Sequence, residues 1–239
     1  MTLDPITKIN PEHTKKFSSF LKNKSIEGIY RTKINFEDKS VLIDVFPTVF
    51  PPDHAPSSKS VFETFGDLRG FNVADIGCGT GVQSIVASLA GAVHVDCSDI
   101  NPQAVECAEH NVLLNGLQDK ITVFSSNLFS NYPSKKYDLI IANLPFVNFP
   151  AGNDFIDQAL YDNDFTLHKR FFTEAKIFLS REGIIHLPHA NLQSAHTLEP
   201  RHDFEIIEKM INDYGYQVVE RHERSEDGFV WINYRIKLK

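Results

Sequence analysis

Val73-Ala-Asp-Ile-Gly-Cys-Gly-Thr-Gly-Val82 is the stretch of this sequence that decides the fold. The apolar run at residues 71–76 is typical of a buried strand, and residues 82–89 have the apolar spacing of a helix. Between them lie three glycines, Gly77, Gly79 and Gly81. Glycine permits a tight turn and lets the backbone approach a ligand without a Cβ in the way. The stretch therefore predicts a strand, a ligand-binding turn and a helix.

The alternation of strand and helix continues along the chain. We expect strands at residues 71–76, 92–97, 121–124, 137–142 and 183–187, and helices at 58–65, 82–89, 102–114, 168–179 and 204–213. Parallel strands require crossover connections, so this order predicts an α/β fold, a doubly wound and mostly parallel seven-stranded sheet of the Rossmann-like kind. Two β-prone runs at 216–221 and 229–237, joined by the turn-like Ser225-Glu-Asp-Gly, predict an antiparallel hairpin at the sheet edge.

Residues 1–57 are expected to form a small extension ahead of the main domain at residues 58–239. Apolar and basic residues between 12 and 24 have the spacing of an amphipathic helix, and β-prone runs follow between 29 and 49. The segment Pro47 to Ser58 is rich in proline, which cannot continue a helix or a central strand, so we expect a loop there.

Composition narrows the functional classes. The net charge of −7 is unfavourable for binding a large nucleic acid, because that binding draws on cationic surface. Three cysteines without a CxxC pair argue against a disulfide framework or a structural zinc site. The N-terminus has no apolar signal-peptide core, and no apolar run approaches the roughly 18 residues of a membrane helix, so we expect a soluble cytoplasmic protein.

The glycine stretch resembles the first motif of class I S-adenosylmethionine-dependent methyltransferases. The resemblance implies S-adenosylmethionine as cofactor, with Asp75 orienting the loop and the methionine end of the cofactor. The loop residues implied to bind it are Gly77, Cys78, Gly79 and Gly81. The alternative is a nicotinamide oxidoreductase, but a dinucleotide fingerprint would place Gly or Ala where this chain has Val82. A purely structural role for the turn, or a catalytic thiol at Cys78, is less favoured.

Two further segments resemble later motifs of the same family. Asp99-Ile100-Asn-Pro-Gln-Ala matches the motif whose acid takes both ribose hydroxyls, so Asp99 and Ile100 are expected at the cofactor, with Asp96 as a rival acid. A carboxylate suits this task because it accepts two hydrogen bonds at once. Asn127 stands where many relatives have the acid that receives the adenine amino group, and an amide oxygen can still accept that bond.

Asn143-Leu-Pro-Phe146 follows the strand at 137–142 and resembles the Asn-Pro-Pro-Tyr/Phe signature of amino-methyltransferases, which include protein-glutamine, adenine-N6 and ribosomal-RNA guanine-N2 enzymes. The resemblance implies that Asn143 and the carbonyl of Leu144 accept the two hydrogens of a planar nitrogen, while Phe146 stacks on it and Pro145 fixes the turn. Asn143 is also expected to contact the cofactor. Leu144 replaces the commoner first proline, which leaves the substrate class open.

The implied function is N-methylation of an amide or exocyclic amino nitrogen. A small planar metabolite or a protein amide is the favoured acceptor, an RNA or DNA base (guanine-N2 or adenine-N6) is the second choice, and a non-catalytic S-adenosylmethionine-binding module is the alternative of another class. The resemblance covers roughly residues 58 to 190, where Gln158-Ala-Leu-Tyr-Asp-Asn-Asp lacks the two glycines of the relatives' Ala-Leu-Asp-Gly-Gly.

Residues outside these motifs are further candidates for the site. Phe50, Asp53 and His54 of the proline-rich loop are expected near the site. Four histidines raise the possibility of a metal site: His186, His189, His196 and His202. No metal is predicted, because strand residues three apart point to opposite faces. The histidines are instead expected to lie in loops, lining a substrate pocket or facing solvent.

Overall fold

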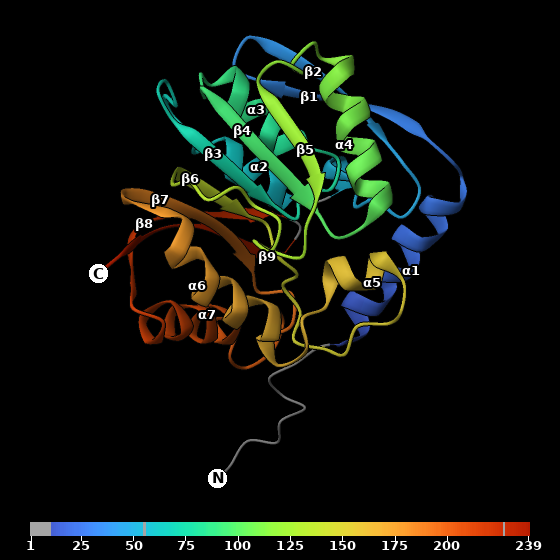
Figure 1. Cartoon of the computed structure of the whole chain (residues 1–239). Coiled ribbons are helices and arrows are strands. Elements are labelled where there is room, and N and C mark those ends of the chain that lie inside the picture. The colour runs from blue at the N-terminus through green and yellow to red at the C-terminus, as the bar shows by residue number, and fades with distance from the viewer. Residues whose placement is uncertain (1–10, 55, 227) are drawn as a thin grey trace.

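The quoted stretch begins in β3 (Asn72–Ile76), which lies in the middle of a seven-stranded sheet (Figure 1). The computed structural model of the chain describes residues 11–54, 56–226 and 228–239. The sheet has the order β5-β4-β3-β6-β7-β9-β8. Its other strands are β4 (His94–Asp99), β5 (Ile121–Ser125), β6 (Tyr137–Ala142), β7 (Leu179–Ala190), β8 (Tyr216–Glu226) and β9 (Phe229–Leu238).

The strands from β3 to β7 are parallel, and β9 runs antiparallel to both β7 and β8. The prediction of a mostly parallel sheet with an antiparallel C-terminal pair is therefore confirmed. β9 inserts between β7 and β8, so the last strand in sequence is not the edge strand. Asp227, in the turn between these two strands, lies outside the described residues.

Successive strands are added on opposite sides of β3. β4 and β5 follow on one side of it, and β6 and β7 on the other. Ile76, the last residue of β3, is level with Ser98 of β4 and Ala142 of β6. The carboxyl ends of the three strands therefore meet at one edge, which is where open α/β sheets form a ligand-binding crevice.

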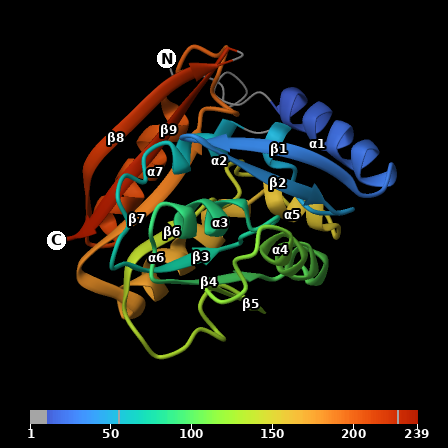
Figure 2. The same ribbon diagram turned by 90° about the horizontal axis from the view of Figure 1, so that it is seen from above.

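Helices cover both faces of the sheet (Figures 1 and 2). α6 (Thr166–Phe178) and α7 (His202–Asp213) pack on one face through Phe171, Phe172, Phe204 and Ile207. The other face carries α2 (Pro56–Phe62), α3 (Val82–Leu89) and α4 (Pro102–Leu114). Burial of these apolar stripes on the sheet is the main stabilising term of the fold.

A two-stranded hairpin, β1 (Tyr30–Phe36) and β2 (Lys39–Val45), packs beside α3 and α4. Its residues Val41, Ile43 and Val45 are buried in the same cluster as Val73 of β3. Residues ahead of position 57 thus share a core with the main sheet. The division of the chain at residue 57 stays a prediction.

The N-terminal helix α1 (Pro11–Ile26) lies beside α5 (Phe155–Leu160), as Figures 1 and 2 both show. The helix expected at residues 12–24 is confirmed, whereas residues 1–10 of the expected extension lie outside the described part. Two short 3-10 turns complete the fold: η2 (Pro52–His54) and η3 (Asn163–Phe165). Of the described helices, none combines the length and the apolar character needed to cross a membrane.

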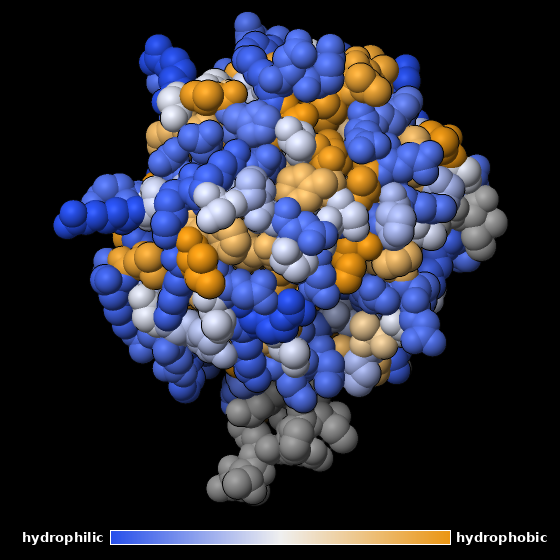
Figure 3. Space-filling view, in the orientation of Figure 1, coloured by the Kyte–Doolittle hydropathy of each residue, from blue (hydrophilic) through white to orange (hydrophobic). Residues whose placement is uncertain are grey.

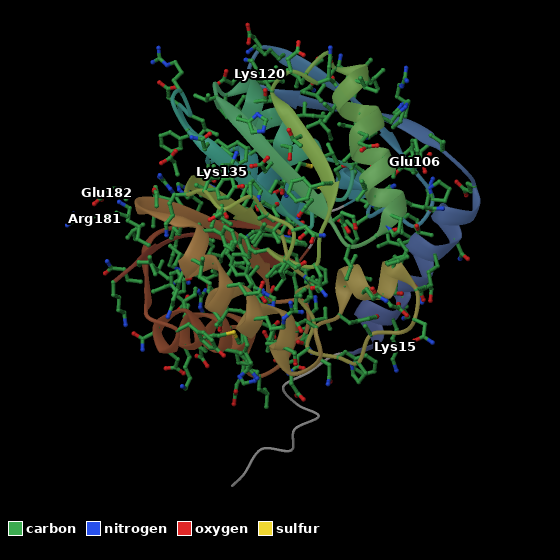
Figure 4. All side chains as sticks on the ribbon, in the orientation of Figure 1. Lys15, Glu106, Lys120, Lys135, Arg181 and Glu182 are labelled. Atoms are coloured by element: carbon green, nitrogen blue, oxygen red, sulfur yellow. The ribbon has the colours of Figure 1, made fainter. Side chains whose placement is uncertain are left out.

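Most predicted strands and helices agree with the structure to within two or three residues. β7 and β8 are the exceptions: β8 continues to Glu226 where the sequence predicts its end at Arg221, and β7 begins at Leu179 where the sequence predicts a strand only from Gly183. The segment Ser180-Arg-Glu182 is partly exposed, and Arg181 and Glu182 point outward from the sheet in Figure 4. When the first residues of a strand are polar, the hydrophobic pattern of the sequence does not indicate that the strand begins there.

Candidate active site

A cavity of about 190 Å³ lies at the carboxyl ends of β3, β4 and β6. Its wall combines the glycine loop, the residues after β4, β5 and β6, the proline-rich loop, α5 and one residue of β9. Most of the residues predicted from the motifs line it: Gly77, Cys78, Gly79, Asp99, Ile100, Asn127, Asn143, Leu144, Pro145 and Phe146. Asp75 and Gly81 are not among the lining residues. The roles assigned to all of them stay predictions.

The glycine loop is held by its own backbone. The N–H groups of Gly77 and Cys78 both donate to the carbonyl of Ser98 at 2.9 Å. Gly77 has φ +71°, and a Cβ built there would meet no protein atom within 4 Å, so its open side faces free space. The loop thus forms a cradle that a side chain at this position would partly fill.

Asp75 lies beneath the loop and is only 1% exposed. Its Oδ2 accepts a hydrogen bond of 2.6 Å from Oγ of Ser84 in α3. Burial raises the pKa of the Asp75 carboxyl from 3.8 to about 7, because a charged group is disfavoured away from water. The residue therefore links β3 to α3, the two elements that the glycine loop connects.

Asp99, at the end of β4, faces the cavity. Its two carboxylate oxygens accept the backbone N–H groups of Gly79 and Asn101, each at 2.9 Å. Burial raises the pKa of Asp99, while these backbone donors act in the opposite direction. A carboxylate has about four acceptor sites, so these bonds leave it with acceptor capacity for a ligand.

The rival acid Asp96 lies elsewhere. It is buried and bonded to the hydroxyl of Tyr137 and to Nζ of Lys135, both at 2.6 Å. Three positions separate Asp96 from Asp99 on β4, and an odd separation on a strand places side chains on opposite faces. Of the two acids only Asp99 lines the cavity.

Asn127 is exposed at the cavity rim beyond β5. Its Oδ1 accepts a hydrogen bond of 3.1 Å from Nη1 of Arg170 in α6. An amide oxygen has two lone pairs, so one remains for a ligand.

Asn143 follows β6 and is half-buried. Its Nδ2 donates to Oγ of Ser57, at the start of α2, over 3.3 Å. This contact engages the nitrogen end of the amide and leaves Oδ1 for an incoming donor. Leu144 packs into the core, and Phe146 makes edge-to-face contacts with His189 and Trp231.

The helix that carries Ser57 is fixed at its other end. Nδ2 of Asn233 in β9 donates to Oγ1 of Thr64 at 2.5 Å, and Nδ1 of His186 lies 3.4 Å from the same oxygen. These contacts connect the segment after α2 to β9 and β7.

The expectation of loop histidines is wrong for His186 and His189, which lie in β7 and are buried, and for His202, which begins α7. His186 packs near Phe65, whereas His189 packs near Phe146. Burial lowers the pKa of His186 to about 3 and that of His189 well below its usual value, so both rings are neutral. Within the described ranges no group of three or more His, Cys, Asp or Glu could hold a metal ion.

The Cys78 thiol is buried beside Cys97. This neighbour and the burial together hold the pKa of the Cys78 thiol well above its usual value, which keeps it protonated. A protonated thiol is a poor nucleophile.

The proline-rich loop contributes only in part as expected. Phe50 lines the cavity. Asp53 instead accepts a hydrogen bond of 2.9 Å from the hydroxyl of Tyr30, and His54 packs edge-on against Phe20.

Several wall residues were missed by the sequence analysis. They are Ser57 and Ser58 of α2, Gln83 of α3, Phe155 and Gln158 of α5, and Trp231 of β9. Trp231 is the one tryptophan of the sequence, which was the only signal that could have marked it. Among the described residues that line the cavity, Asp99 is the only Asp, Glu, Lys, Arg or His.

The known proteins to which this chain is similar are methyltransferases. The family model described as "Methyltransferase small domain" matches residues 47–220. A ribosomal protein L11 methyltransferase of Caldanaerobacter subterraneus is 44% identical over 111 residues, which cover 45% of this chain and 35% of that protein. A putative protein N5-glutamine methyltransferase of Methanocaldococcus jannaschii is 29% identical over 163 residues, 65% of this chain and 79% of that protein.

Solved structures share the fold. The crystal structure of a ribosomal protein L11 methylase from Lactobacillus delbrueckii superposes with a TM-score of 0.58 at 21% identity, covering 80% of this chain and 81% of that one. The match to the Caldanaerobacter protein, by contrast, spans little more than a third of that relative's length.

Proposed function

Since the chain belongs to the methyltransferase small domain family, we propose that it is an S-adenosylmethionine-dependent N-methyltransferase. The observation that carries the proposal is that Asn143 lines the same cavity as Asp99 and the glycine loop. A residue suited to orient an amino nitrogen and residues suited to hold a nucleoside therefore share one space. Methyl transfer needs both in one place.

The cavity fits the cofactor. Asp99 is fixed by two backbone N–H groups with acceptor capacity left for ribose hydroxyls, and the open side of Gly77 leaves room for a ligand against the loop. Asn127 retains an acceptor site for the adenine amino group. When bound, S-adenosylmethionine supplies the methyl group from a positively charged sulfur.

The residues after β6 would prepare the acceptor nitrogen. The lone pair of an amide or exocyclic amino nitrogen is delocalised, so the nitrogen is a weak nucleophile. Oδ1 of Asn143 and the carbonyl of Leu144 would accept its two N–H hydrogens, which fixes its direction and favours charge developing on it. The ring of Phe146, supported by Trp231, would pack against the planar group.

We propose a protein amide, of the glutamine side-chain kind, as the acceptor. The cavity wall offers no basic side chain for a phosphate among its described residues, and the chain carries a net charge of −7. Both features disfavour a nucleic acid. The relative from Methanocaldococcus jannaschii, described as a putative protein N5-glutamine methyltransferase, supports the same choice.

The test is incubation of a cell extract with the protein and cofactor labelled in its methyl group, followed by separation of proteins, nucleic acids and small molecules. We expect label in the protein fraction, as methylated glutamine by mass spectrometry. Asn143→Ala should abolish labelling while S-adenosylhomocysteine binding, measured by calorimetry, stays within about twofold.

Each other result has a defined meaning. Label in nucleic acid or in small molecules would replace the proposed acceptor, and full activity of Asn143→Ala would remove the role of that residue. Binding without any labelling would indicate a non-catalytic module. Binding of NAD in place of S-adenosylmethionine would indicate an oxidoreductase.

A further inference from the structure

Gln83 is a buried polar residue that the proposed chemistry does not use. It lies in the first turn of α3, lines the cavity and is only 4% exposed. Its Oε1 is shielded from solvent and has no hydrogen-bond partner in the described part of the chain. Buried polar atoms are nearly always paired, so an unpaired one in a cavity wall indicates a ligand that pairs with it.

The strand order places Gln83 at a defined point of the cavity. Along the carboxyl edge, β5, β4, β3 and β6 are neighbours in that order. Asn127 follows β5, and Asp99 ends β4. The glycine loop and Gln83 follow β3, and Asn143 follows β6. Gln83 thus lies between the residue proposed for the ribose and the residue proposed for the acceptor nitrogen.

The part of the cofactor that belongs at this point is its amino-acid end. Once adenine and ribose lie over β5 and β4, the chain of atoms beyond the ribose runs toward β3 and α3. That end carries an ammonium and a carboxylate, and each requires hydrogen-bond partners when it leaves water. Asp75, the nearby acid, lies beneath the loop and outside the cavity wall.

We propose that Gln83 binds the amino-acid end of the cofactor. A carboxamide has an oxygen that accepts from the ammonium and an NH₂ that donates to the carboxylate, so one neutral side chain serves both charges. The inference rests on the proposed use of S-adenosylmethionine. It adds a contact outside the glycine motif itself.

A pair of ligands can distinguish a contact to the amino-acid end of the cofactor from contacts to its nucleoside and sulfur. S-adenosylhomocysteine has the amino-acid end, whereas 5′-methylthioadenosine has the same nucleoside and sulfur without it. Calorimetric titration of both ligands into the wild type and into Gln83→Met is the experiment. Methionine has nearly the length and volume of glutamine but offers neither an N–H donor nor an oxygen acceptor.

We expect Gln83→Met to weaken S-adenosylhomocysteine about tenfold, as for loss of a hydrogen bond to a charged group, and to change 5′-methylthioadenosine less than twofold. The exposed Gln118→Met, outside the cavity wall, serves as the matched control and should bind both ligands as the wild type does. Retained 5′-methylthioadenosine binding shows that a variant is folded. Gln83→Leu, which also lacks the carboxamide, is a second variant and should change the binding of the two ligands in the same way.

An equal loss for both ligands would overturn the proposal, because Gln83 would then only shape the cavity. No loss for either ligand would overturn it as well, because Gln83 would then make no contact that contributes to binding of the cofactor. A wild type that binds neither ligand would refute the proposed function itself, which is a separate result.

Discussion

Nδ2 of Asn143 and Oγ of Ser57 lie 3.3 Å apart, although 86 positions separate the two residues in sequence. The contact orients the amide so that its oxygen is the end left for a substrate. We therefore predict that Ser57 is a positioning residue for Asn143.

Removal of this hydroxyl should slow methyl transfer. We expect Ser57→Ala to reduce the rate about tenfold, the effect of roughly one hydrogen bond, with S-adenosylhomocysteine affinity unchanged. Ser57→Thr keeps the hydroxyl and should restore most of the rate. The measurement is the initial rate of label transfer into the extract fraction that accepts methyl groups.

Ser88→Ala is the control for Ser57. Ser88 is also buried, and its Oγ, outside the cavity wall, has no partner among the described residues, so its replacement should leave the rate unchanged. Weaker cofactor binding with an unchanged rate in Ser57→Ala would show instead that the hydroxyl contacts the cofactor.

The buried Asp75 should make stability depend on pH. Its pKa is raised from 3.8 to about 7, so between these values the unfolded chain is ionised while the folded one holds the proton. Stability due to this group is complete below 3.8 and falls as the pH rises toward 7. From pH 5 to pH 7 we expect a loss of about 2 kcal/mol, measured by urea unfolding.

Asp75→Asn cannot ionise and should lack this part of the pH dependence. A wild type and an Asp75→Asn variant whose stabilities change in parallel between pH 5 and pH 7 would show that Asp75 is ionised throughout.

Gly81 should be sensitive to any side chain. It caps α3 with φ +76°, and a Cβ built there lies 3.1 Å from Cβ of Ala108 in α4. Gly81→Ala combines the left-handed backbone penalty of about 1–2 kcal/mol with a close contact. We expect a total loss of about 2–3 kcal/mol in chemical unfolding.

Gly116 provides the comparison, because it has φ +67° with nothing within 4 Å of a built Cβ. Gly116→Ala should show the backbone penalty alone. Equal losses at both sites would mean that α4 moves aside at Gly81 without cost.

Helix α1 should stabilise the wall formed by α5. Leu21 is 1% exposed and packs with Ile156 and Leu160, while Oγ of Ser18 and Nζ of Lys22 bind Asp157 at 2.7 and 2.8 Å. Leu21→Ala should destabilise this contact by about 2–4 kcal/mol, as for other core leucines. Faster hydrogen exchange at residues 155–160 is the measurement.

Leu113→Ala is the matched control, since Leu113 in α4 is 64% exposed. It should leave exchange at residues 155–160 unchanged. Slow exchange there in Leu21→Ala would show that α5 holds its place without α1.

The surface around α4 mixes hydrophilic and hydrophobic side chains, as Figure 3 shows for this face.

The sequence predicts those parts of the site that a single strand and the turn after it create. β3 with its glycine loop, Asp99 after β4 and the segment from Asn143 to Phe146 are of this kind, and all but Asp75 and Gly81 of the residues predicted there line the cavity. Asp75 does not line the cavity, because its carboxylate points toward α3 and accepts a hydrogen bond from Ser84. That direction depends on packing against α3.

Other parts of the site depend on tertiary structure. α5 has six residues, too few for a helical period to show. Ser57 and Trp231 reach the cavity only because α2 and β9 pack beside distant strands. The burial of His189 likewise depends on the continuation of β7 to Ala190, beyond the predicted end at residue 187.

The insertion of β9 between β7 and β8 has a consequence for synthesis on the ribosome. A nascent chain that has emerged as far as residue 190 already contains the glycine loop, Asp99 and Asn143, but not Trp231 or Asn233. Trp231 lines the cavity, and Asn233 holds Thr64 and with it the helix of Ser57. A nascent chain that has emerged only as far as β7 therefore cannot form the complete pocket, and the side proposed for the acceptor forms only after β9 has left the ribosome.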